Sequence, residues 1–333
     1  MGSETNHVKG AILSGADPAA VRLAGKVIQA GGLVAFPTET VYGLGCDAFN
    51  ADAAAKVFEA KQRPQFDPLI VHIADPGQLE AVIDSLPPLG RRLIDAFWPG
   101  PLTLVLSKQQ AIPDLVTAGL STVAVRMPNH PVAQALIREA GTPIAAPSAN
   151  PFGYVSPTTA RHVADGLGSN VDLILDGGPC PVGVESTIVS LAGPQPELLR
   201  PGCITIEQLG ALIGPLRRSS STTERPLAPG QLSRHYATRT PLTILPAVGA
   251  RPVLNSDKRA GLLIHARPQN GTDGFAAVEV LSSRGDLREA ARHLFAALRR
   301  LDALDLDRIY AEPCAEEGIG AAIMDRLRRC AAP

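Results

Sequence analysis

Apolar residues in this chain fall into short runs of strand length that alternate with longer stretches of helical period. Residues 33–36 and 69–73 are two such runs, each long enough for one buried strand. Between them, a helical pattern begins with Asn50 or Asp52 as its cap and ends before Pro64. The polar residues of this segment gather at the connections, which is where small ligands bind in open α/β sheets. The segment therefore predicts a strand, a turn, a helix and a second strand beside a ligand site.

The alternation continues to residue 213 and predicts a mixed sheet with helices around it. Further strands are expected at residues 102–106, 122–126, 144–146, 171–175, 186–189 and 198–200. Helices are expected at residues 18–28, 89–97, 131–140, 158–165 and 205–213, with a short helix starting at residue 75. The fold class that this order predicts is α/β.

Residues 214–240 differ in composition from the segments on either side. They are rich in Ser, Thr, Pro and Arg and have almost no apolar periodicity, which is typical of a linker. Tyr236 within this linker has no nearby apolar partner in the sequence. After it, strands are expected at residues 242–245, 262–264, 278–281 and 308–311, and helices at 286–301 and 320–329. We therefore expect a first domain at 1–213, the linker, and a smaller domain at 241–333 with parallel, nucleotide-fold-like alternation.

The overall composition narrows the class of protein. A chain of 333 residues is long enough for two domains, and 45% apolar residues support an ordinary buried core. The formal net charge of −1 weighs against an extended nucleic-acid platform, although a local basic cleft is compatible with it. Five scattered cysteines without a C-x-x-C pair indicate reduced thiols, and the sequence shows neither a signal peptide nor an apolar run of membrane length. We expect a soluble cytoplasmic protein without a membrane partner.

Candidate chemistry lies on the predicted loops, where cations and hydroxyls recur together. The sequence lacks the G-x-x-x-x-G-K-[ST] and G-x-G-x-x-G loops, the H-E-x-x-H zinc motif and the G-x-S-x-G elbow. Guanidinium groups bind phosphates through paired charge-assisted hydrogen bonds, and hydroxyls add neutral donors. Residues of these types on loops or at strand ends are Lys61, Arg63, Thr122, Arg126, Ser148, Asn150, Ser156, Ser186, Thr187 and Arg200. Such a set suits a triphosphate or another anion.

Each of these residues also has an ordinary structural explanation. Lys61 and Arg63 stand at a helix C-terminus, where a cation favours the helix dipole by roughly 0.3–1 kcal/mol. His72 lies in an apolar strand, where a hydrogen-bonded core histidine is the more frequent case. Ser148 and Asn150 are common turn formers. The residue pattern alone predicts an intracellular α/β protein with an anion pocket and goes no further.

Eight stretches of the chain carry a specific resemblance to a known family. They are FPTETVYGLGCDA at 36–48, AKQRP at 60–64, PLIVHI at 68–73, WPGPLTLVL at 98–106, STVAVRMP at 121–128, PSAN at 147–150, ESTIV at 185–189 and LLRPG at 198–202. In this order they resemble the YrdC-like threonylcarbamoyl-AMP synthase family. PGQLSRHYA at 229–237 is similar to the linker signature of the family's long form, which carries a C-terminal accessory domain.

This resemblance implies a fold and a reaction. The fold would be a YrdC-like twisted mixed sheet flanked by helices, followed by a smaller Rossmann-like α/β domain. Family members condense L-threonine, bicarbonate and ATP into threonylcarbamoyl-AMP and release pyrophosphate. A separate tRNA threonylcarbamoyltransferase then uses the product to modify an adenosine of certain tRNAs. Magnesium would accompany ATP as the cofactor, and direct contact with tRNA is compatible with this function but not required by it.

The family's functional residues carry over by motif position. The threonine-binding residues would be Thr40, His72, Arg126, Ala146 and Ser186. The ATP-binding residues would be Arg63, Asp67, Thr122, Ser148, Asn150, Ser156, Arg200 and Tyr236. Lys61 and Arg63 form the family's K-x-R pair and would be the catalytic cations, while Tyr236 would reach back from the linker to cover the pocket.

One position departs from the family's pattern, and two other functions compete. Asp67 stands where the family commonly has asparagine, and its carboxylate would repel phosphates unless magnesium or Lys61 compensates. A non-catalytic RNA-binding protein could use a basic cleft of the first domain, against which the near-neutral charge and the lack of interleaved aromatics weigh. A carbamoyl-transfer domain of the hydrogenase-maturation type ranks low, because the additional zinc-finger-like and acylphosphatase-like segments of those proteins are absent from the sequence.

Overall fold

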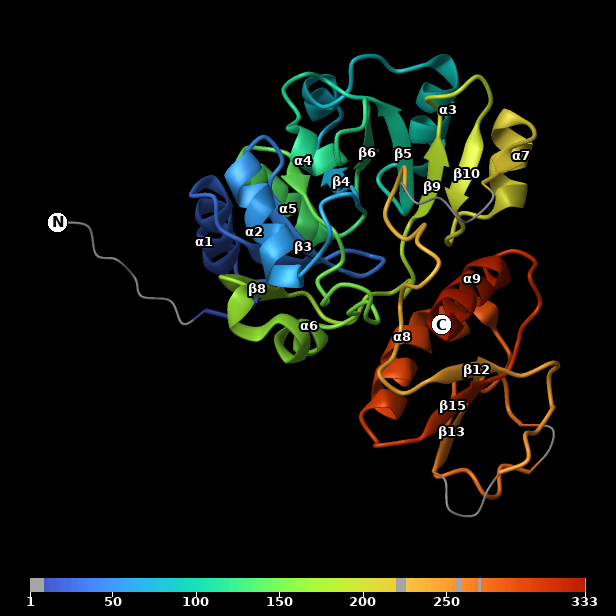
Figure 1. Ribbon diagram of the computed structural model, residues 1–333. Coiled ribbons are helices and arrows are strands. Elements are labelled where there is room, and N and C mark those ends of the chain that lie inside the picture. Colours follow the sequence, from blue (N-terminus) through green and yellow to red (C-terminus); the bar gives the residue numbers. More distant parts are fainter. Residues whose placement is uncertain (1–8, 220–225, 255–258, 269–270, 333) are drawn as a thin grey trace.

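The structure is a computed structural model and describes residues 9–219, 226–254, 259–268 and 271–332. These residues form two units, each built on its own sheet (Figure 1). The strands of the larger sheet are β1 (Ala11–Ser14), β2 (Val34–Pro37), β3 (Tyr42–Asp47), β4 (Ile70–His72), β5 (Leu102–Ser107), β6 (Thr122–Arg126), β7 (Ile144–Ala145), β8 (Leu173–Asp176), β9 (Thr187–Ser190), β10 (Glu197–Arg200) and β11 (Arg217–Arg218). Its helices are α1 (Pro18–Gln29), α2 (Ala51–Lys61), α3 (Pro88–Phe97), α4 (Asp114–Thr117), α5 (Pro131–Ala140), α6 (Ala160–Leu167) and α7 (Ile206–Ile213), with 3₁₀ helices η1 (Pro76–Ala81) and η2 (Gly168–Asn170).

The larger sheet mixes parallel and antiparallel pairs. Its order is β1-β8-β2-β3-β7-β4-β6-β5-β9-β10-β11. β2 and β3 form an antiparallel hairpin, whereas β1 with β8, β4 with β6, and β5 with β9 pair in parallel. The predicted α/β class, with a mixed sheet flanked by helices, is therefore confirmed.

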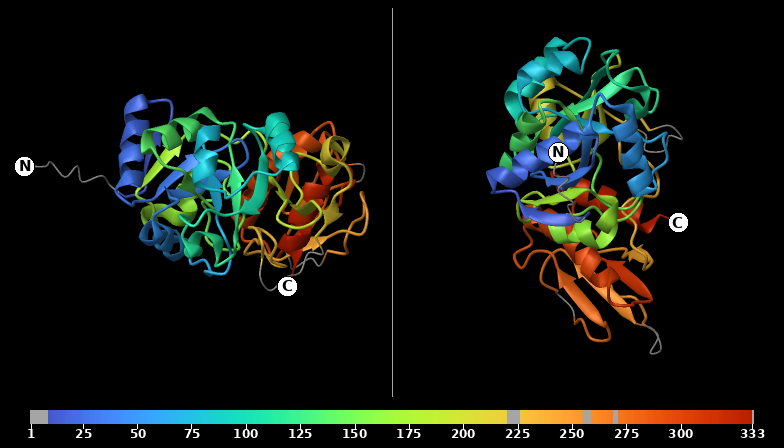
Figure 2. Two further views of the ribbon diagram at one scale, coloured as in Figure 1. Left: turned by 90° about the horizontal axis from the view of Figure 1, so that it is seen from above. Right: turned by 90° about the vertical axis from the view of Figure 1, so that its left-hand side faces the viewer.

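The smaller unit contains a second sheet with two long helices. Its elements are β12 (Leu242–Ile244), β13 (Ala260–Ile264), β14 (Ala277–Val280), β15 (Arg308–Ala311), α8 (Leu287–Asp302) and α9 (Gly320–Ala331). The strand order is β12-β15-β13-β14 and every pair is parallel, as predicted. α8 and α9 lie between this sheet and the larger unit, and the smaller unit stays at one end of the molecule in every view (Figures 1 and 2).

The two faces of the larger sheet have different covers, because successive side chains of a strand point to opposite faces. On one face, α2, α3, α4, α6 and α7 pack against the strands in one continuous core. On the opposite face, α1 and α5 cover the part built by β2, β7 and β8. The rest of that face carries Ile70 of β4 and Ala124 of β6, and it packs against Ala228 of the linker. Ala228 of the linker therefore packs on the part of the sheet that no helix covers among the described residues.

The turn predicted between the first strand and the helix is correct only in part, because residues 38–41 form a turn but residues 42–47 form the unpredicted strand β3. Gly43 and Gly45 lie in this strand, and packing across the sheet explains Gly45. A Cβ atom on Gly45 would lie 2.7 Å from Ile144 Cγ2 and 2.8 Å from Phe36 Cε1. The glycine thus allows neighbouring side chains to approach the strand closely. Strand β1 and helix α4 were likewise not predicted.

The two units contact each other through side chains of α8 and the loops of the larger unit. Arg292 Nε donates to Pro181 O at 2.7 Å, and Tyr154 Oη donates to Asp302 Oδ2 at 2.7 Å. Val155 of the larger unit belongs to the same apolar core as the inner faces of α8 and α9. The units are therefore joined by buried apolar contacts as well as by polar ones.

Three further expectations can be compared with the structure. All five cysteines are free thiols, as expected. Among the described residues, no helix is long and apolar enough to cross a membrane. α7 ends at Ile213, β11 adds a short strand to the larger sheet after it, and β12 begins at Leu242. The domain limits at residues 213 and 241 stay predictions.

Candidate functional site

A pocket lies on the part of the sheet that the linker covers. It is lined by Thr38, Thr40, Val41, Gly43, Arg63, Ile70, His72, Arg126, Ala146, Pro147, Ser148, Glu185, Ser186, Arg200, Pro229, Gly230, His235 and Tyr236. Segments that are far apart in the sequence therefore meet around one space. The free volume between these side chains is about 40 Å³, which holds a few water molecules at most.

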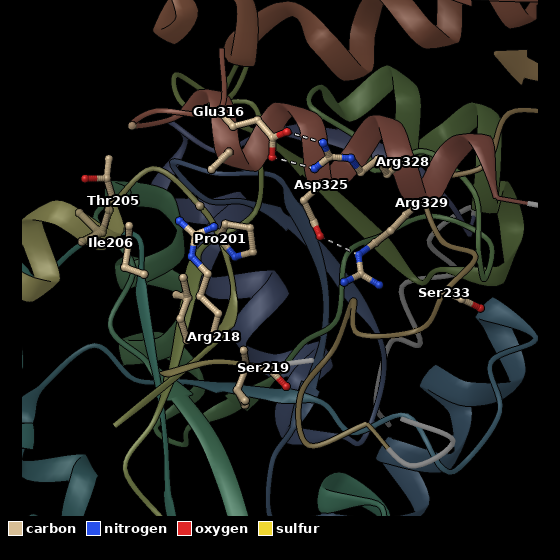
Figure 3. Close-up of a pocket in the computed structure, with 16 residues that line it drawn as sticks. Pro201, Thr205, Ile206, Arg218, Ser219, Ser233, Glu316, Asp325, Arg328 and Arg329 are labelled. Carbon is tan, nitrogen blue, oxygen red and sulfur yellow. Dashed lines mark hydrogen bonds and ion pairs between the residues drawn. The ribbon is translucent and has the colours of Figure 1, made fainter. Parts of the chain in front are cut away.

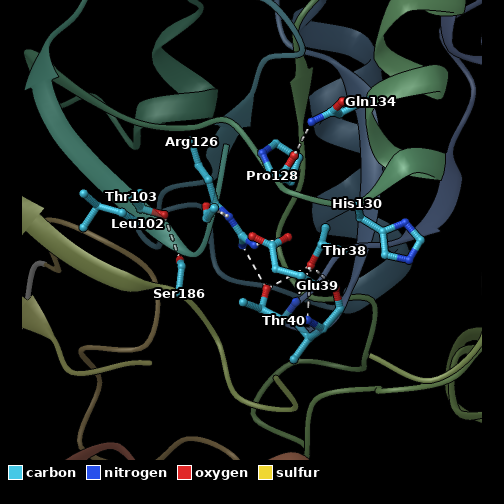
Figure 4. Close-up of polar contacts among 12 residues, drawn as sticks. Thr38, Glu39, Thr40, Leu102, Thr103, Arg126, Pro128, His130, Gln134 and Ser186 are labelled. Carbon is cyan, nitrogen blue, oxygen red and sulfur yellow. Dashed lines mark hydrogen bonds and ion pairs between the residues drawn. The ribbon is translucent and has the colours of Figure 1, made fainter. Parts of the chain in front are cut away.

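Arg126, the last residue of β6, lies among acceptors on the loop that follows β2 (Figure 4). Its Nη2 is 2.7 Å from Glu39 Oε2, its Nη1 donates to Thr40 Oγ1 at 2.9 Å, and its Nε donates to Gly100 O at 3.2 Å. The Arg126 side chain is only 3% exposed, so this ion pair is buried. A guanidinium carries five N–H groups, and two of them remain for a further acceptor.

The loop at residues 38–41 holds Thr40 in place through a local hydrogen-bond turn. Thr38 Oγ1 donates to Val41 O at 2.6 Å and accepts from the backbone N–H groups of Thr40 and Val41, each at 3.2 Å. Thr38 and Thr40 are also joined through their hydroxyls at 2.9 Å. The Thr40 hydroxyl is thus fixed between Thr38 and Arg126 before any ligand arrives.

His72 ends β4 and forms part of the pocket wall. Its ring lies edge-on to Phe36 with centroids 6.0 Å apart, and its Nδ1 is 3.1 Å from Ile70 O. Burial, with a smaller effect of the Arg126 charge, lowers the pKa of His72 to about 3. His72 is therefore a neutral, hydrogen-bonded buried histidine that also faces the pocket.

Arg200 at the end of β10 is held against the start of β9. Its Nε donates to Ser186 O at 3.0 Å, its Nη2 to Ser186 Oγ at 3.1 Å, and its Nη1 to Pro229 O of the linker at 3.1 Å. Ser186 Oγ is also 2.8 Å from Thr103 Oγ1. Within the part of the chain that the structure describes, no carboxylate forms an ion pair with Arg200, in contrast to Arg63 and Arg126.

Arg63 lines the pocket and is paired with Asp67. Its Nη2 is 2.8 Å from Asp67 Oδ2, and it also donates to the carbonyls of Asp67 and Pro68 at 3.1 and 2.9 Å. Burial raises the pKa of the Asp67 carboxyl, and the Arg63 charge is the strongest opposing influence. The carboxylate that departs from the family's pattern is thus compensated mainly by Arg63, rather than by Lys61 as expected.

Lys61 does not line this pocket, although it precedes Arg63 by only two residues. Its fully buried Nζ donates to the backbone carbonyls of Ser148 and Asn150, in the loop after β7. Burial, followed by the Arg63 charge, lowers the pKa of Lys61 well below its usual value. The structure therefore places Lys61 behind the loop that carries Ser148, and its predicted contact with phosphates stays a prediction.

Besides Asp67, three residues predicted to bind ATP lie outside the pocket lining. Asn150 Nδ2 donates to two backbone carbonyls of the following loop, each at 2.8 Å, and Ser156 Oγ donates to Glu185. Thr122 begins β6 on the same face as Arg126, about 13 Å away along the strand. Asn150 and Ser156 thus shape the loops around the pocket, while Thr122 stands at the far end of the same sheet face.

The linker closes the pocket with His235 and Tyr236. The Tyr236 ring stacks on Phe295 of α8, with centroids 5.5 Å apart, and meets the His235 ring at 4.1 Å. The apolar partner that Tyr236 lacks in the sequence therefore comes from the smaller unit. Tyr236 has a φ of 61°, a left-handed conformation that costs about 1 kcal/mol or more in a non-glycine residue. Neighbouring Gly230 has a φ of 82°, and a Cβ there would lie 2.7 Å from Tyr236 Oη.

Sequence reasoning did not assign a role to several residues of this site. Glu185 lines the pocket, and Glu39 forms an ion pair with Arg126. Each of these glutamates directly precedes a predicted residue in the sequence, and this adjacency was the signal that could have indicated them. His235 precedes Tyr236 in the same way. Arg326 of α9 contacts Glu185 across 141 residues of sequence, and no local pattern points to it.

A larger cavity of about 330 Å³ lies between β10, α7 and α9 (Figure 3). Arg218 enters it from one side, while Arg328 pairs with Glu316 and Arg329 with Asp325 on the other. These carboxylates neutralise two of its three arginines. None of the residues predicted to bind substrate lines this cavity, so we assign the reaction to the smaller pocket.

The residues present do not form a metal site of their own. Among the described residues, no cluster of three or more His, Cys, Asp or Glu side chains is positioned to hold an ion. The carboxylates at the pocket, Glu39, Asp67 and Glu185, each pair with an arginine. A magnesium ion would therefore be held mainly by the phosphates that bring it, as is usual for nucleotide enzymes.

Buried histidines make the fold sensitive to acid. The pKa of His72 is lowered to about 3 and that of His162 to about 4, in both cases mainly by burial. Both rings are neutral in the folded chain at pH 5, whereas the unfolded chain binds protons near pH 6.5. Stability is therefore full above about pH 6.5 and decreases as the pH falls, by roughly 2 kcal/mol per histidine at pH 5. Urea unfolding at pH 7 and pH 5 measures this loss. Burial also lowers the pKa values of His130 and His235, so His162→Gln is expected to remove only the share of one histidine from this loss. An unchanged loss of stability between pH 7 and pH 5 in that variant would contradict the prediction.

Comparisons with known proteins agree with this site and fold. A family model described as "Telomere recombination" matches residues 26–202, and one described as "Threonylcarbamoyl-AMP synthase, C-terminal domain" matches residues 204–332. The chain is 46% identical to the threonylcarbamoyl-AMP synthase of Bacillus subtilis, over 96% of this chain and 94% of the relative. It is 42% identical to that of Pyrococcus abyssi, over 93% of each chain. The crystal structure of P. abyssi Sua5 complexed with L-threonine superposes with a TM-score of 0.87 at 39% identity, covering 95% of each chain.

These similarities extend over both units and the linker between them. They include the segments that carry Arg63, Arg126 and Arg200, which lie inside the first matched region. The resemblance inferred from the motifs is thereby confirmed. The chain belongs to the threonylcarbamoyl-AMP synthase family.

Proposed function

We propose that this protein condenses L-threonine, bicarbonate and ATP into threonylcarbamoyl-AMP with release of pyrophosphate. The names of its full-length relatives and the P. abyssi complex with L-threonine support this reaction. The observation that carries the proposal is the convergence of Arg63, Arg126 and Arg200 on one pocket. An amino acid and a nucleotide that react with each other need separate cations at the two ends of a shared site.

The amino acid would bind beside Arg126. The two N–H groups that this guanidinium has left match the two oxygens of an α-carboxylate. The hydroxyls of Thr40 and Ser186 are both buried and held in place, and both line the pocket. They are the groups that we assign to the side-chain hydroxyl of threonine, while the neutral His72 ring and Ala146 border the same end.

The nucleotide would extend from Arg63 and Arg200 along the sheet. Burial lowers the pKa of both guanidinium groups, which means that their surroundings disfavour the charge and that a bound phosphate would offset this cost. Ser148 adds a hydroxyl on the same wall. The apolar patch that contains Ile70 and Ala124 offers a floor for the adenine ring, between the pocket and Thr122.

The chemistry requires charge stabilisation rather than a covalent nucleophile. The neutral amine of threonine attacks bicarbonate with loss of water, or carbon dioxide with loss of a proton from the amine, and forms an N-carboxylate. An oxygen of this carboxylate attacks the α-phosphorus of ATP, and pyrophosphate leaves. Negative charge grows on the phosphoryl oxygens during this step, and preorganised cations such as Arg63 and Arg200 stabilise it without rearranging. Magnesium would supply further charge neutralisation on the phosphates when ATP brings it.

The linker must move during each cycle. The closed pocket has a free volume of about 40 Å³, whereas sites for molecules of this size measure roughly 300–1,000 Å³. ATP therefore enters only after the segment with His235 and Tyr236 has withdrawn. Its return would exclude water from the labile carbamoyl-adenylate until a tRNA threonylcarbamoyltransferase receives it.

The alternative of a non-catalytic RNA-binding protein finds no support in this geometry. The pocket arginines are buried, with exposed fractions of 6% for Arg63 and 3% for Arg126 and Arg200. RNA binding of the electrostatic kind needs basic side chains on an accessible face. We therefore retain the enzymatic function.

A comparison of three amino acids tests the proposed site. With ATP and bicarbonate present, L-threonine is expected to give the highest rate of pyrophosphate release. L-serine lacks one methyl group and should lose about 10- to 200-fold in kcat/KM, whereas L-2-aminobutyrate lacks the hydroxyl and should lose up to about 10⁴-fold. The larger second loss is expected because buried hydrogen-bonding groups of the protein would be left without a partner.

Variants of the two hydroxyl residues provide the control. Thr40→Val and Ser186→Ala should each reduce the discrimination between threonine and 2-aminobutyrate, since they remove a group that the hydroxyl satisfies. Wild-type protein that releases no pyrophosphate with any of the three amino acids would refute the proposed function. Equal rates with threonine and 2-aminobutyrate would refute the assignment of the hydroxyl site alone.

A further inference from the structure

Arg326 of α9 is fully buried, with an exposed fraction of 0%, although arginine is among the residues least often found in that state. It belongs to the smaller unit. Its guanidinium nevertheless lies against the larger unit and the linker, next to the pocket. Packing of the two units alone does not explain why a charged side chain is buried at this position.

The Arg326 guanidinium makes three contacts outside its own unit. Its Nε donates to Glu185 Oε2 at 2.9 Å, and its Nη1 donates to Pro201 O at 2.9 Å. Its central carbon lies 5.2 Å from the centroid of the Tyr236 ring, which is a cation–π geometry. Asp325 accepts a further hydrogen bond from Nη1 at 2.7 Å and holds the guanidinium from within α9.

Each of these contacts ends beside a residue of the proposed nucleotide site. Glu185 lines the pocket and precedes Ser186, which binds Arg200. Pro201 directly follows Arg200. Tyr236 closes the pocket in a strained left-handed conformation that must be held by its surroundings. One side chain of the smaller unit thus touches three segments that form the same end of the pocket.

The electrostatics favour a positioning role over simple stabilisation. Buried ion pairs are on average no more stabilising than apolar groups of the same size, because both charges lose their hydration. Joining the two units needs no such pair, since an apolar core already spans them. A guanidinium, however, fixes direction as well as distance, because its donors form a rigid planar fork. α9 holds the linker at a second point as well, where Arg329 donates to Leu232 O.

We propose that Arg326 is a positioning residue for the reaction, which orients Arg200 and Tyr236 toward the nucleotide by fixing Pro201, Glu185 and the tyrosine ring. This inference rests on the proposed function and deepens it, because it assigns to the C-terminal unit a part in forming the ATP site. The threonine end of the pocket, around Thr40 and Arg126, has no contact with Arg326.

Steady-state kinetics of pyrophosphate release separate the two ends of the pocket. Arg326→Met is expected to raise KM for ATP by about tenfold or more and to raise KM for threonine much less, because Ser186 is the one assigned threonine residue that adjoins a contact of Arg326. Arg326→Lys keeps the charge but loses the planar fork, so it is expected to recover only a small part of the effect. Arg328→Met is the matched control, because Arg328 lies on the same helix but is exposed and, among the described residues, forms an ion pair with Glu316 alone. It should retain both KM values.

A second set of variants distinguishes positioning from loss of folding. Arg326→Met leaves the buried Glu185 carboxylate without its arginine, so the thermal midpoint is expected to fall. The double variant Arg326→Met/Glu185→Gln removes the orphaned charge, and its midpoint should return toward the wild-type value while KM for ATP stays raised. Glu185→Gln alone keeps an amide oxygen as acceptor for Arg326, while its amide N–H group can donate to the Ser156 hydroxyl, and it should change KM for ATP less than Arg326→Met does.

These measurements distinguish a positioning role of Arg326 from a purely structural one. The positioning role is supported if KM for ATP rises selectively and stays raised in Arg326→Met/Glu185→Gln after the thermal midpoint has recovered. Parallel changes in both KM values, recovery of KM for ATP together with stability in the double variant, or kinetics equal to those of Arg328→Met would overturn it. Wild-type protein without any threonine-dependent pyrophosphate release would instead refute the proposed function.

Discussion

Arg63→Ala is expected to lower ATP-dependent pyrophosphate release by about 10³-fold. Arg63 lines the pocket and is one of the two arginines that we place at the phosphates. Its guanidinium is fixed by Asp67 and by two backbone carbonyls, so it is already oriented when charge develops on the phosphoryl oxygens. Alanine removes this charge, and no other described cation occupies the same part of the lining. Pyrophosphate release at saturating threonine, bicarbonate and ATP measures the effect.

The same substitution is expected to destabilise the fold. It leaves the fully buried Asp67 carboxylate without its partner, which costs about 3–5 kcal/mol. The double variant Arg63→Ala/Asp67→Asn removes the orphaned charge and should regain most of the stability in urea without regaining turnover. Arg91→Ala, at an exposed position of α3, is a control for general effects of losing an arginine. Normal turnover in the folded double variant would show that Arg63 does not act on the phosphates.

A chain that ends at Ile213 is expected to lose threonylcarbamoyl-AMP formation by about 10²-fold or more, because a loosely formed site loses that much when catalytic groups shift by about 1 Å. The truncation removes every linker residue of the pocket wall, together with the contact of Arg200 to Pro229. Water then reaches the labile intermediate freely. Chromatographic detection of the acyl-adenylate measures the loss.

Truncation also exposes apolar surface, and a second variant separates this effect from loss of the lid. Val41, Val155 and Val184 pack in the core shared with α8 and α9, so the shortened chain is expected to be less stable and less soluble. Tyr236→Ala in the full-length chain keeps this core nearly complete and removes only the central ring of the closure. It should lower product formation by about tenfold or more, since the closed conformation loses its stacking on Phe295. Full activity of the truncated chain would rule out a role of the linker.

The local course of the fold was predictable from short-range patterns. The helix predicted at residues 131–140 is α5, and of the two caps predicted for α2, Asn50 or Asp52, it is Asn50 that accepts from Ala53 N at 3.0 Å. Strand β3 was not predictable in this way, because its glycines resemble those of a turn. Their use becomes clear only where Gly45 faces Ile144 and Phe36 across the sheet.

The residues of the site were predictable from sequence motifs, whereas the directions of their side chains were not. Motif positions indicated Arg63, Arg126 and Arg200, and the structure brings these three to one pocket. Lys61 is only two residues from Arg63, but it faces the carbonyls of the next loop because α2 ends there and Gln62 takes a left-handed φ of 52°. Side chains that are close in sequence can therefore point in different directions at the end of a helix, and a pattern of residue types does not predict those directions.

The order of most strands and helices, the two-unit architecture and the family were determined by the sequence itself. They depend on periodicity, caps and motifs whose parts lie within about a dozen residues of one another. Only the tertiary structure decided which charges face the substrates and which are neutralised. It placed Glu39 against Arg126 and Asp67 against Arg63, and it brought Arg326 to Glu185 across 141 residues of chain. Such contacts arise from the packing of separate elements, whose relative positions no local pattern specifies.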